Sequence, residues 1–176
     1  MDYQALEEHI KDSVMEEQAK LGFRKEVIRL YYPVGMLNNL FGTACDAEEM
    51  QQALAGFTDF AKKRLGEVTI THKKDRFCLL LPEETRIYVH EHKKENEFIH
   101  QLVNLIASHE TDMEQVKKLF EQQPFPSVVE QTTGGEFDTV IHFTQGDDRY
   151  YYCFKDEGFH ITYHRFLPAD YKDLGV

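Results

Sequence analysis

The chain has 176 residues, with 20 basic and 31 acidic side chains, and its formal net charge is therefore −11. No stretch approaches the run of about 18 apolar residues that a membrane-spanning helix needs, and no basic-then-apolar run at the N-terminus is typical of a secretory signal. A strongly acidic chain also repels phosphate backbones. These figures argue against a membrane and against nucleic acid as the main partner.

The composition indicates a globular protein, because 13 Phe and 9 Tyr provide ample core material. A chain of this length fits one domain, so we expect residues 1–176 to form a single domain. Cys45, Cys78 and Cys153 are far apart and contain no Cys-x-x-Cys spacing. They are most simply buried free thiols in a reducing cytosol, which predicts a cytoplasmic location. A catalytic cysteine is the alternative, since reactivity depends on a lowered pKa.

The first half of the sequence alternates helical and extended patterns. Apolar residues at helical spacing end at Gly22, and a β-branched and aromatic run ends at Pro33. Asp46 with Glu49 is typical of a capping box, and Gly66 is a natural stop for the helix that it begins. We therefore expect helices over 3–21 and 46–65, and strands over 26–32, 68–72 and 77–81, the last two joined by a polar tip at 73–76. Pro33 closes the first strand, or it is instead the first residue of a short helix that runs to Phe41.

The second half begins with an ambiguous segment, 85–92, which is either a third strand or part of a helix. A wide apolar face then predicts a helix over 98–106, and Thr111 with Glu114 suggests a capping box for the next one. Two acidic, glycine-containing turns separate three extended segments near 137–145, 149–155 and 159–166.

These elements predict an α+β fold. We expect antiparallel meander strands with helices packed on one face of the sheet. A doubly wound parallel sheet is disfavoured because regular alternation of strands and helices is missing.

A register argument predicts a binding surface on the last three strands. If each turn contains three loop residues, His142 lies opposite Tyr152, and Tyr152 lies opposite Thr162. Histidine, tyrosine and threonine side chains then gather on one sheet face. Apolar walls with a few placed polar groups are typical of ligand sites. The alternative is that helices cover this face, and that its Tyr and His side chains form hydrogen bonds to those helices through their polar ends. The predicted ligand-binding residues are His142, Tyr150, Tyr152, His160, Thr162 and His164.

A second hypothesis concerns His90 and His92. On a strand, both imidazoles lie on one face, about 7 Å apart. A zinc ion needs three or four ligands, so a metal site also needs a distant group such as His72 or a carboxylate. The alternative is a set of half-exposed polar histidines.

The signatures of common enzyme classes are missing from the sequence. We find no phosphate loop, no dinucleotide fingerprint, no nucleophile elbow and no His-Glu-x-x-His zinc motif. Acidic side chains lie mostly on predicted helix surfaces, where solvation is their ordinary role. The sequence therefore assigns no catalytic residue and no cofactor, and it favours a protein that is not an enzyme.

Three segments carry a resemblance to known proteins: Phe23–Pro33, Tyr88–His92 and Tyr152–Phe166. They resemble a family of small uncharacterised bacterial proteins that form a domain of unknown function. The resemblance implies a bacterial cytosolic origin and transfers no catalytic residue.

Together these observations predict a non-catalytic ligand-binding or protein-interaction domain that uses the His/Tyr-rich sheet face. Its partner is an unknown small molecule or protein. The alternative function is a metal-binding protein or metal-dependent enzyme centred on His90 and His92. A third possibility is a homodimer that buries the tyrosine-rich face.

Overall fold

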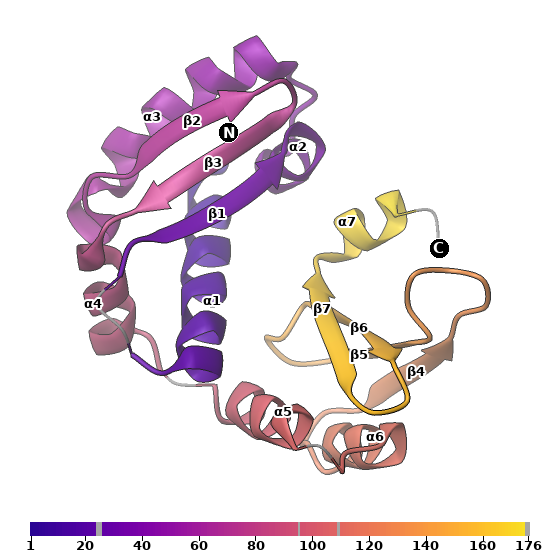
Figure 1. Ribbon diagram of the computed structural model, residues 1–176. Coiled ribbons are helices and arrows are strands. Elements are labelled where there is room, and N and C mark those ends of the chain that lie inside the picture. The colour runs from indigo at the N-terminus through magenta and orange to yellow at the C-terminus, as the bar shows by residue number, and fades with distance from the viewer. Residues whose placement is uncertain (24–25, 95, 109, 175–176) are drawn as a thin grey trace. The chain divides into compact units, whose positions relative to one another are not determined.

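The computed structural model describes residues 1–23, 26–94, 96–108 and 110–174. The predicted α+β class is confirmed, because helices accompany two antiparallel sheets. The chain forms two compact units, residues 1–96 and 97–176, and each is described by itself (Figure 1). The assignment of residues 1–176 to a single domain stays a prediction.

The first unit contains a three-stranded antiparallel sheet with strand order β1-β3-β2. A tight turn joins β2 to β3, and Lys74 adopts a left-handed conformation there, with φ 56°. Helix α3 begins at the predicted capping box, in which Asp46 accepts from the N–H of Glu49 and the Glu49 carboxylate accepts from the N–H of Asp46. The elements are α1 (Tyr3–Leu21), β1 (Ile28–Pro33), α2 (Val34–Phe41), α3 (Ala47–Leu65), β2 (Thr69–Lys73), β3 (Arg76–Leu81) and α4 (Glu83–His92).

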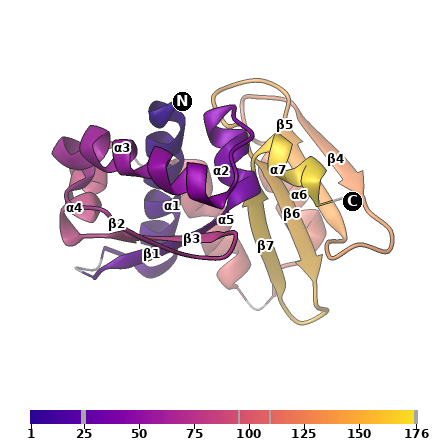
Figure 2. The ribbon, with the colours of Figure 1, turned by 90° about the horizontal axis from the view of Figure 1, so that it is seen from above.

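The helices of this unit lie on one side of its sheet (Figure 2). Alternate residues of the strands face them and form the core. Phe77 and Leu79 of β3 are fully buried, as is Leu81. Tyr32 of β1 is 2% exposed and meets the His9 ring of α1 edge-on, with the centroids 5.6 Å apart. Helices therefore cover one face of the sheet, although Ile70 is partly exposed and His72 exposed along β2.

A buried ion pair links α1 to α3. The Arg64 guanidinium donates to both carboxylate oxygens of Glu7, at 2.7 and 2.6 Å. Glu7 is 3% exposed, and Lys11 also contacts it, at 2.6 Å. Because burial alone raises the pKa of this carboxyl, its net lowering reflects the hydrogen bonds and charges of Arg64 and Lys11.

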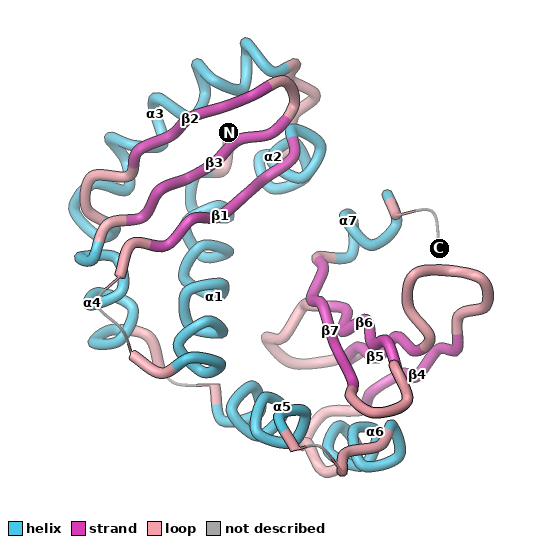
Figure 3. Tube along the Cα trace, viewed as in Figure 1, coloured by secondary structure: helices cyan, strands magenta, loops and turns pink. Residues whose placement is uncertain are grey.

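The second unit contains a four-stranded antiparallel meander with order β4-β5-β6-β7, which confirms the predicted meander (Figure 3). Its elements are α5 (Glu97–Ala107), α6 (Met113–Glu121), β4 (Ser127–Gln131), β5 (Thr139–Phe143), β6 (Tyr151–Asp156), β7 (Ile161–Phe166) and α7 (Pro168–Asp173).

Aromatic rings join this meander to its helices. Phe120 of α6 is fully buried, and its centroid lies 5.3 Å from that of Tyr152 and 4.8 Å from that of Phe98 in α5. The opposite face of the sheet is covered in part by α7, whose Tyr171 ring lies 5.0 Å from Tyr151. The predicted packing of helices on one face therefore describes α5 and α6, while α7 lies against the other face.

Three local expectations need correction. The ambiguous segment 85–92 is helical, since it lies within α4. The capping box of α6 uses Asp112 and Gln115, one residue later than the expected pair. Strand β4 was not among the expected elements. Its first residue, Ser127, directly follows Pro126, and proline is tolerated at the start of an edge strand.

Among the described residues, no helix combines the length and the apolar character needed to cross a bilayer.

The aromatic core of the second unit yields a stability prediction. Phe120→Ala should lower the free energy of unfolding by about 3–5 kcal/mol, because it opens a cavity among packed rings. The matched control is Phe159→Ala, since Phe159 is 75% exposed; its effect should stay within about 0.5 kcal/mol. Urea denaturation followed by circular dichroism measures both, and equal losses would contradict the described packing.

Candidate functional site

The pairing of the last three strands differs from the expected register. His142 of β5 lies opposite Tyr151, not Tyr152. Tyr152 of β6 lies opposite Arg165 of β7, not Thr162. The β5–β6 alignment is thus shifted by one residue, and the β6–β7 alignment by three. An odd shift moves a residue to the opposite sheet face, because side chains alternate along a strand.

The loops explain these shifts. The expected register assumed three loop residues in each turn. In the structure, residues 144–150 join β5 to β6 and residues 157–160 join β6 to β7. Within the first loop, the Asp148 carboxylate accepts from the N–H of Tyr150, and Gly146 has a positive φ of 93°. Loop length therefore sets the register, and the sequence pattern did not reveal it.

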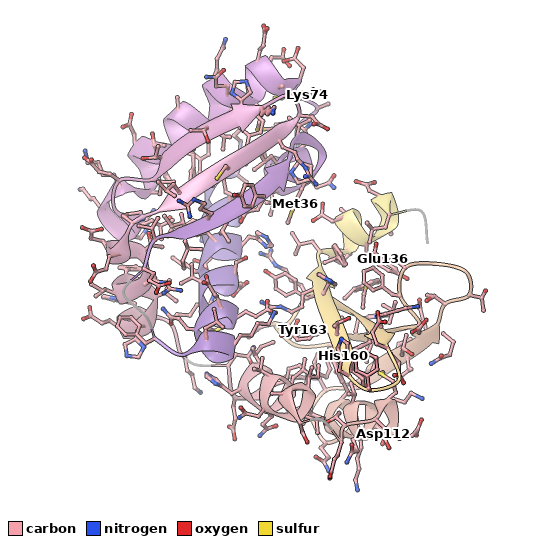
Figure 4. The ribbon with its side chains drawn as sticks, in the orientation of Figure 1. Met36, Lys74, Asp112, Glu136, His160 and Tyr163 are labelled. Carbon is pink, nitrogen blue, oxygen red and sulfur yellow. The ribbon has the colours of Figure 1, made fainter. Side chains whose placement is uncertain are left out.

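The predicted ligand-binding residues consequently do not share one surface. Tyr152 is fully buried against α5 and α6, while His142, Thr162 and His164 lie on the opposite sheet face. Tyr150 precedes β6 and is 5% exposed. His160 lies in the β6–β7 turn, directly before β7, which carries Tyr163 (Figure 4).

The two faces of this sheet have different surroundings. On the face opposite α5 and α6, the His142 ring stacks on Tyr151 at 4.2 Å. The ring centroids of Phe137 and His164 lie 5.8 Å apart on the same face. The His142 Nδ1 atom is buried and has no hydrogen-bond partner among the described residues. Tyr171 and Phe137 are themselves buried there, so this face is a second small core rather than an open groove.

The buried Tyr152 belongs to a polar contact network. Its hydroxyl donates to the Asp148 carboxylate at 2.6 Å, and the Arg165 guanidinium lies over the Tyr150 ring at 4.5 Å. Burial and the neighbouring Asp148 charge raise the pKa of the Tyr152 hydroxyl well above its usual range, although Arg165 opposes this. The phenol therefore stays neutral and positions the 144–150 loop.

The two histidines of the metal hypothesis lie on a helix, which removes its geometric basis. Residues two apart on a helix point in different directions. The His90 ring packs on Phe23 at 4.7 Å, and His92 stacks on Tyr88 at 4.3 Å. Among the residues that the structure describes, no group of three or more His, Cys, Asp or Glu side chains could hold a metal ion.

The three cysteines differ in exposure. Burial raises the pKa of the Cys153 thiol to about 12, so it is inert as a nucleophile near neutral pH. All three are free thiols, as expected, but only Cys153 is buried; the expected burial is wrong for Cys45 and Cys78, which are partly exposed.

An unexpected surface lies on the uncovered side of the first unit's sheet. The register places one residue in two from each strand there, and these nine positions are called the basic face. The helices pack on the other side of the sheet (Figure 2). The nine side chains alternate with the helix-facing residues of each strand, so they lie on the side away from the helices. The basic face consists of Arg29, Tyr31 and Pro33 of β1, Arg76, Cys78 and Leu80 of β3, and Thr69, Thr71 and Lys73 of β2.

The basic face carries three cations and no carboxylate. Arg29, Lys73 and Arg76 are exposed. None of them forms an ion pair with another described residue. Tyr31 is 66% exposed on the same face, and Cys78 and Leu80 are partly exposed beside it. Because residues 1–96 hold 14 basic and 17 acidic side chains, the unit as a whole is acidic and this positive surface is a local exception.

The basic face as a whole could not be predicted from the sequence pattern, for a physical reason. Its cations stand far apart in the chain, and only strand pairing brings them together. The alternating pattern Arg29-Leu30-Tyr31 was a usable signal, because an exposed cation and tyrosine flank a residue that faces the helices. The expected four-residue tip at 73–76 placed Lys73 and Arg76 in a loop, whereas they are paired strand residues.

The chain also matches a known protein family. Residues 3–175 match the family described as "Domain of unknown function, E. rectale Gene description (DUF3877)". The chain belongs to the DUF3877 family. The match confirms the resemblance to a bacterial domain of unknown function, and that description names no activity, ligand or partner. No curated protein and no solved structure matches the chain.

Tyr152 provides a pH prediction for this DUF3877 member. A free phenol ionises near pH 10, whereas folded Tyr152 keeps its proton to a higher pH. The unfolded state therefore loses this proton first, and the free energy of unfolding should fall as the pH rises above about 10. Tyr152→Phe should make that fall shallower.

Urea titrations between about pH 8 and pH 11 test the effect, with Tyr31→Phe as the exposed control. The control should follow the wild type. A Tyr152→Phe variant whose stability falls as steeply as that of the wild type would show that the phenol does not control this pH dependence.

Proposed function

We propose that this protein is a non-catalytic interaction domain that binds an acidic segment of a partner protein on the basic face. The supporting observation is the group of three exposed cations around Tyr31, without a carboxylate among the nine positions of the face. Helices cover the opposite side of the sheet, so the fold needs none of these side chains for its core.

The dimensions of the face suit a short segment of polypeptide. Three strands spaced about 4.8 Å apart, each contributing about five residues, give an area of roughly 10 by 14 Å. Each exposed ion pair contributes at most about 1 kcal/mol. We therefore expect moderate, salt-dependent affinity, in which Tyr31, Cys78 and Leu80 provide the apolar contact.

Protein is favoured over nucleic acid as the partner. Three cations neutralise few phosphates, so little counterion release would drive nucleic-acid binding. The surrounding unit carries 17 acidic side chains, which repel an extended phosphate backbone more than a short peptide that occupies the face alone.

Charge reversal tests the proposal. A triple variant, Arg29→Glu with Lys73→Glu and Arg76→Glu, should weaken binding of a fluorescently labelled polyglutamate peptide by at least tenfold in low salt, because it replaces attraction with repulsion. Fluorescence anisotropy measures the dissociation constant, and circular dichroism checks the fold. The probe is polyglutamate because it offers the site only carboxylate side chains on a polypeptide backbone.

A matched control changes the net charge by the same amount elsewhere. Lys63, Lys118 and Lys172 are exposed lysines outside the basic face, and their combined reversal to Glu should change polyglutamate binding by less than about twofold at moderate salt. Equal losses in both triple variants would contradict a localised site. Tighter binding of a single-stranded oligonucleotide than of polyglutamate would contradict the choice of partner.

A further inference from the structure

The outer edge of β1 presents backbone groups that no described residue uses. The Val34 N–H donates to the Asp75 carbonyl at 2.7 Å, and this bond fixes the phase of the β1–β3 ladder. In an antiparallel pair, alternate residues direct their N–H and C=O groups to the same neighbour. Leu30 therefore bonds to β3, while the N–H and C=O groups of Arg29 and Tyr31 point outward.

The outward backbone groups and the basic face belong to the same residues. Arg29 and Tyr31 project their side chains onto the basic face and their N–H and C=O groups from the sheet edge. A strand added to this edge would therefore place alternate side chains directly beside this cation and this ring. The same two residues, Arg29 and Tyr31, therefore offer both backbone hydrogen bonds and side-chain contacts to an added strand.

A groove lies beside the same strand. It has a volume of about 370 Å³ between α1 and the first half of β1. Its α1 wall is formed by Ser13, Glu16, Glu17 and Lys20, and its strand wall by residues 27–30. The remaining side chains of an added strand would point toward this side of the sheet, because successive residues alternate between its two faces. Because the α1 wall carries two carboxylates, the side chains of an added strand that face it should be uncharged, and its acidic side chains should lie on the basic face.

We propose that the acidic partner segment binds as an extended strand that pairs antiparallel with β1, as the other strands of this sheet pair with one another. This inference rests on the proposed function of the basic face and adds the mode of binding. A partner carboxylate lies beside Arg29, while main-chain hydrogen bonds to Arg29 and Tyr31 hold the segment in register. The partner recognised is thus an extended, alternating acidic and apolar stretch rather than a helix.

A second copy of this chain is a poorer occupant of the edge. Pairing of β1 with β1 of another copy would join two basic faces into one continuous surface. Arg29 of both copies and the other cations would then share one side of a six-stranded sheet. Like charges on one sheet face are destabilising, whereas an acidic segment satisfies the same edge with opposite charge.

Backbone methylation of a peptide tests the mode of binding. The probe is a capped seven-residue peptide in which Glu alternates with Val, and its affinity is measured by fluorescence anisotropy. N-methylation of the Glu residues should weaken binding at least tenfold, because their N–H groups would donate to β1 carbonyls. N-methylation of the Val residues should have less than about a threefold effect, because their N–H groups point away from the sheet.

A pair of protein variants tests the β1 side of the same bonds. Tyr31→Ala removes the ring but keeps the outward N–H, whereas Tyr31→Pro removes both. Proline is tolerated at an edge position whose N–H faces outward. We expect Tyr31→Pro to bind the Glu–Val peptide at least fivefold more weakly than Tyr31→Ala, with circular dichroism showing that both variants are folded.

The outcomes separate the two proposals. If N-methylation of the Glu residues and of the Val residues has the same effect on binding, while Arg29→Glu still weakens binding, strand addition is overturned and the basic face remains the site. If Arg29→Glu, Lys73→Glu and Arg76→Glu leave the affinity for the peptide unchanged, the proposed function itself is overturned. If Tyr31→Pro does not fold, the peptide methylation series alone decides the mode of binding.

Discussion

Burial of only one face of the β1-β3-β2 sheet is the constraint on which the rest of the account depends. Side chains alternate along each strand, so the residues that fill the helix-facing core determine which residues face outward. Phe77 and Leu79 are buried against the helices, and Arg76 and Cys78 must then lie on the other side. The basic face therefore consists of the residues that alternate with the core residues along the three strands.

Local chemistry made much of the fold predictable from the sequence. The capping box at Asp46 and the stop at Gly66 located α3, and the apolar spacing up to Gly22 located α1. Segment 85–92 was ambiguous because its apolar residues fit both periodicities. In the structure, Val89 faces the core as a helical residue, and His90 and His92 diverge around α4.

The candidate sites were harder to predict because they depend on pairing between distant segments. An odd-numbered shift in register moved Tyr152 under α6 and left His142 on the opposite face. The same dependence hid the basic face, whose Arg29 and Arg76 are brought to one surface only by the β1–β3 ladder. Net charge, a property of the whole chain, gave no indication of a local positive surface.

Amide hydrogen exchange along β1, followed by NMR, tests this arrangement most directly. The account predicts slow exchange at Leu30 and Tyr32, whose N–H groups bond to β3, and fast exchange at Arg29 and Tyr31 on the open edge. Protection of all four amides would mean that the edge is already covered. Slow exchange at Arg29 and Tyr31 with fast exchange at Leu30 and Tyr32 would reverse the ladder phase and contradict the proposed binding surface.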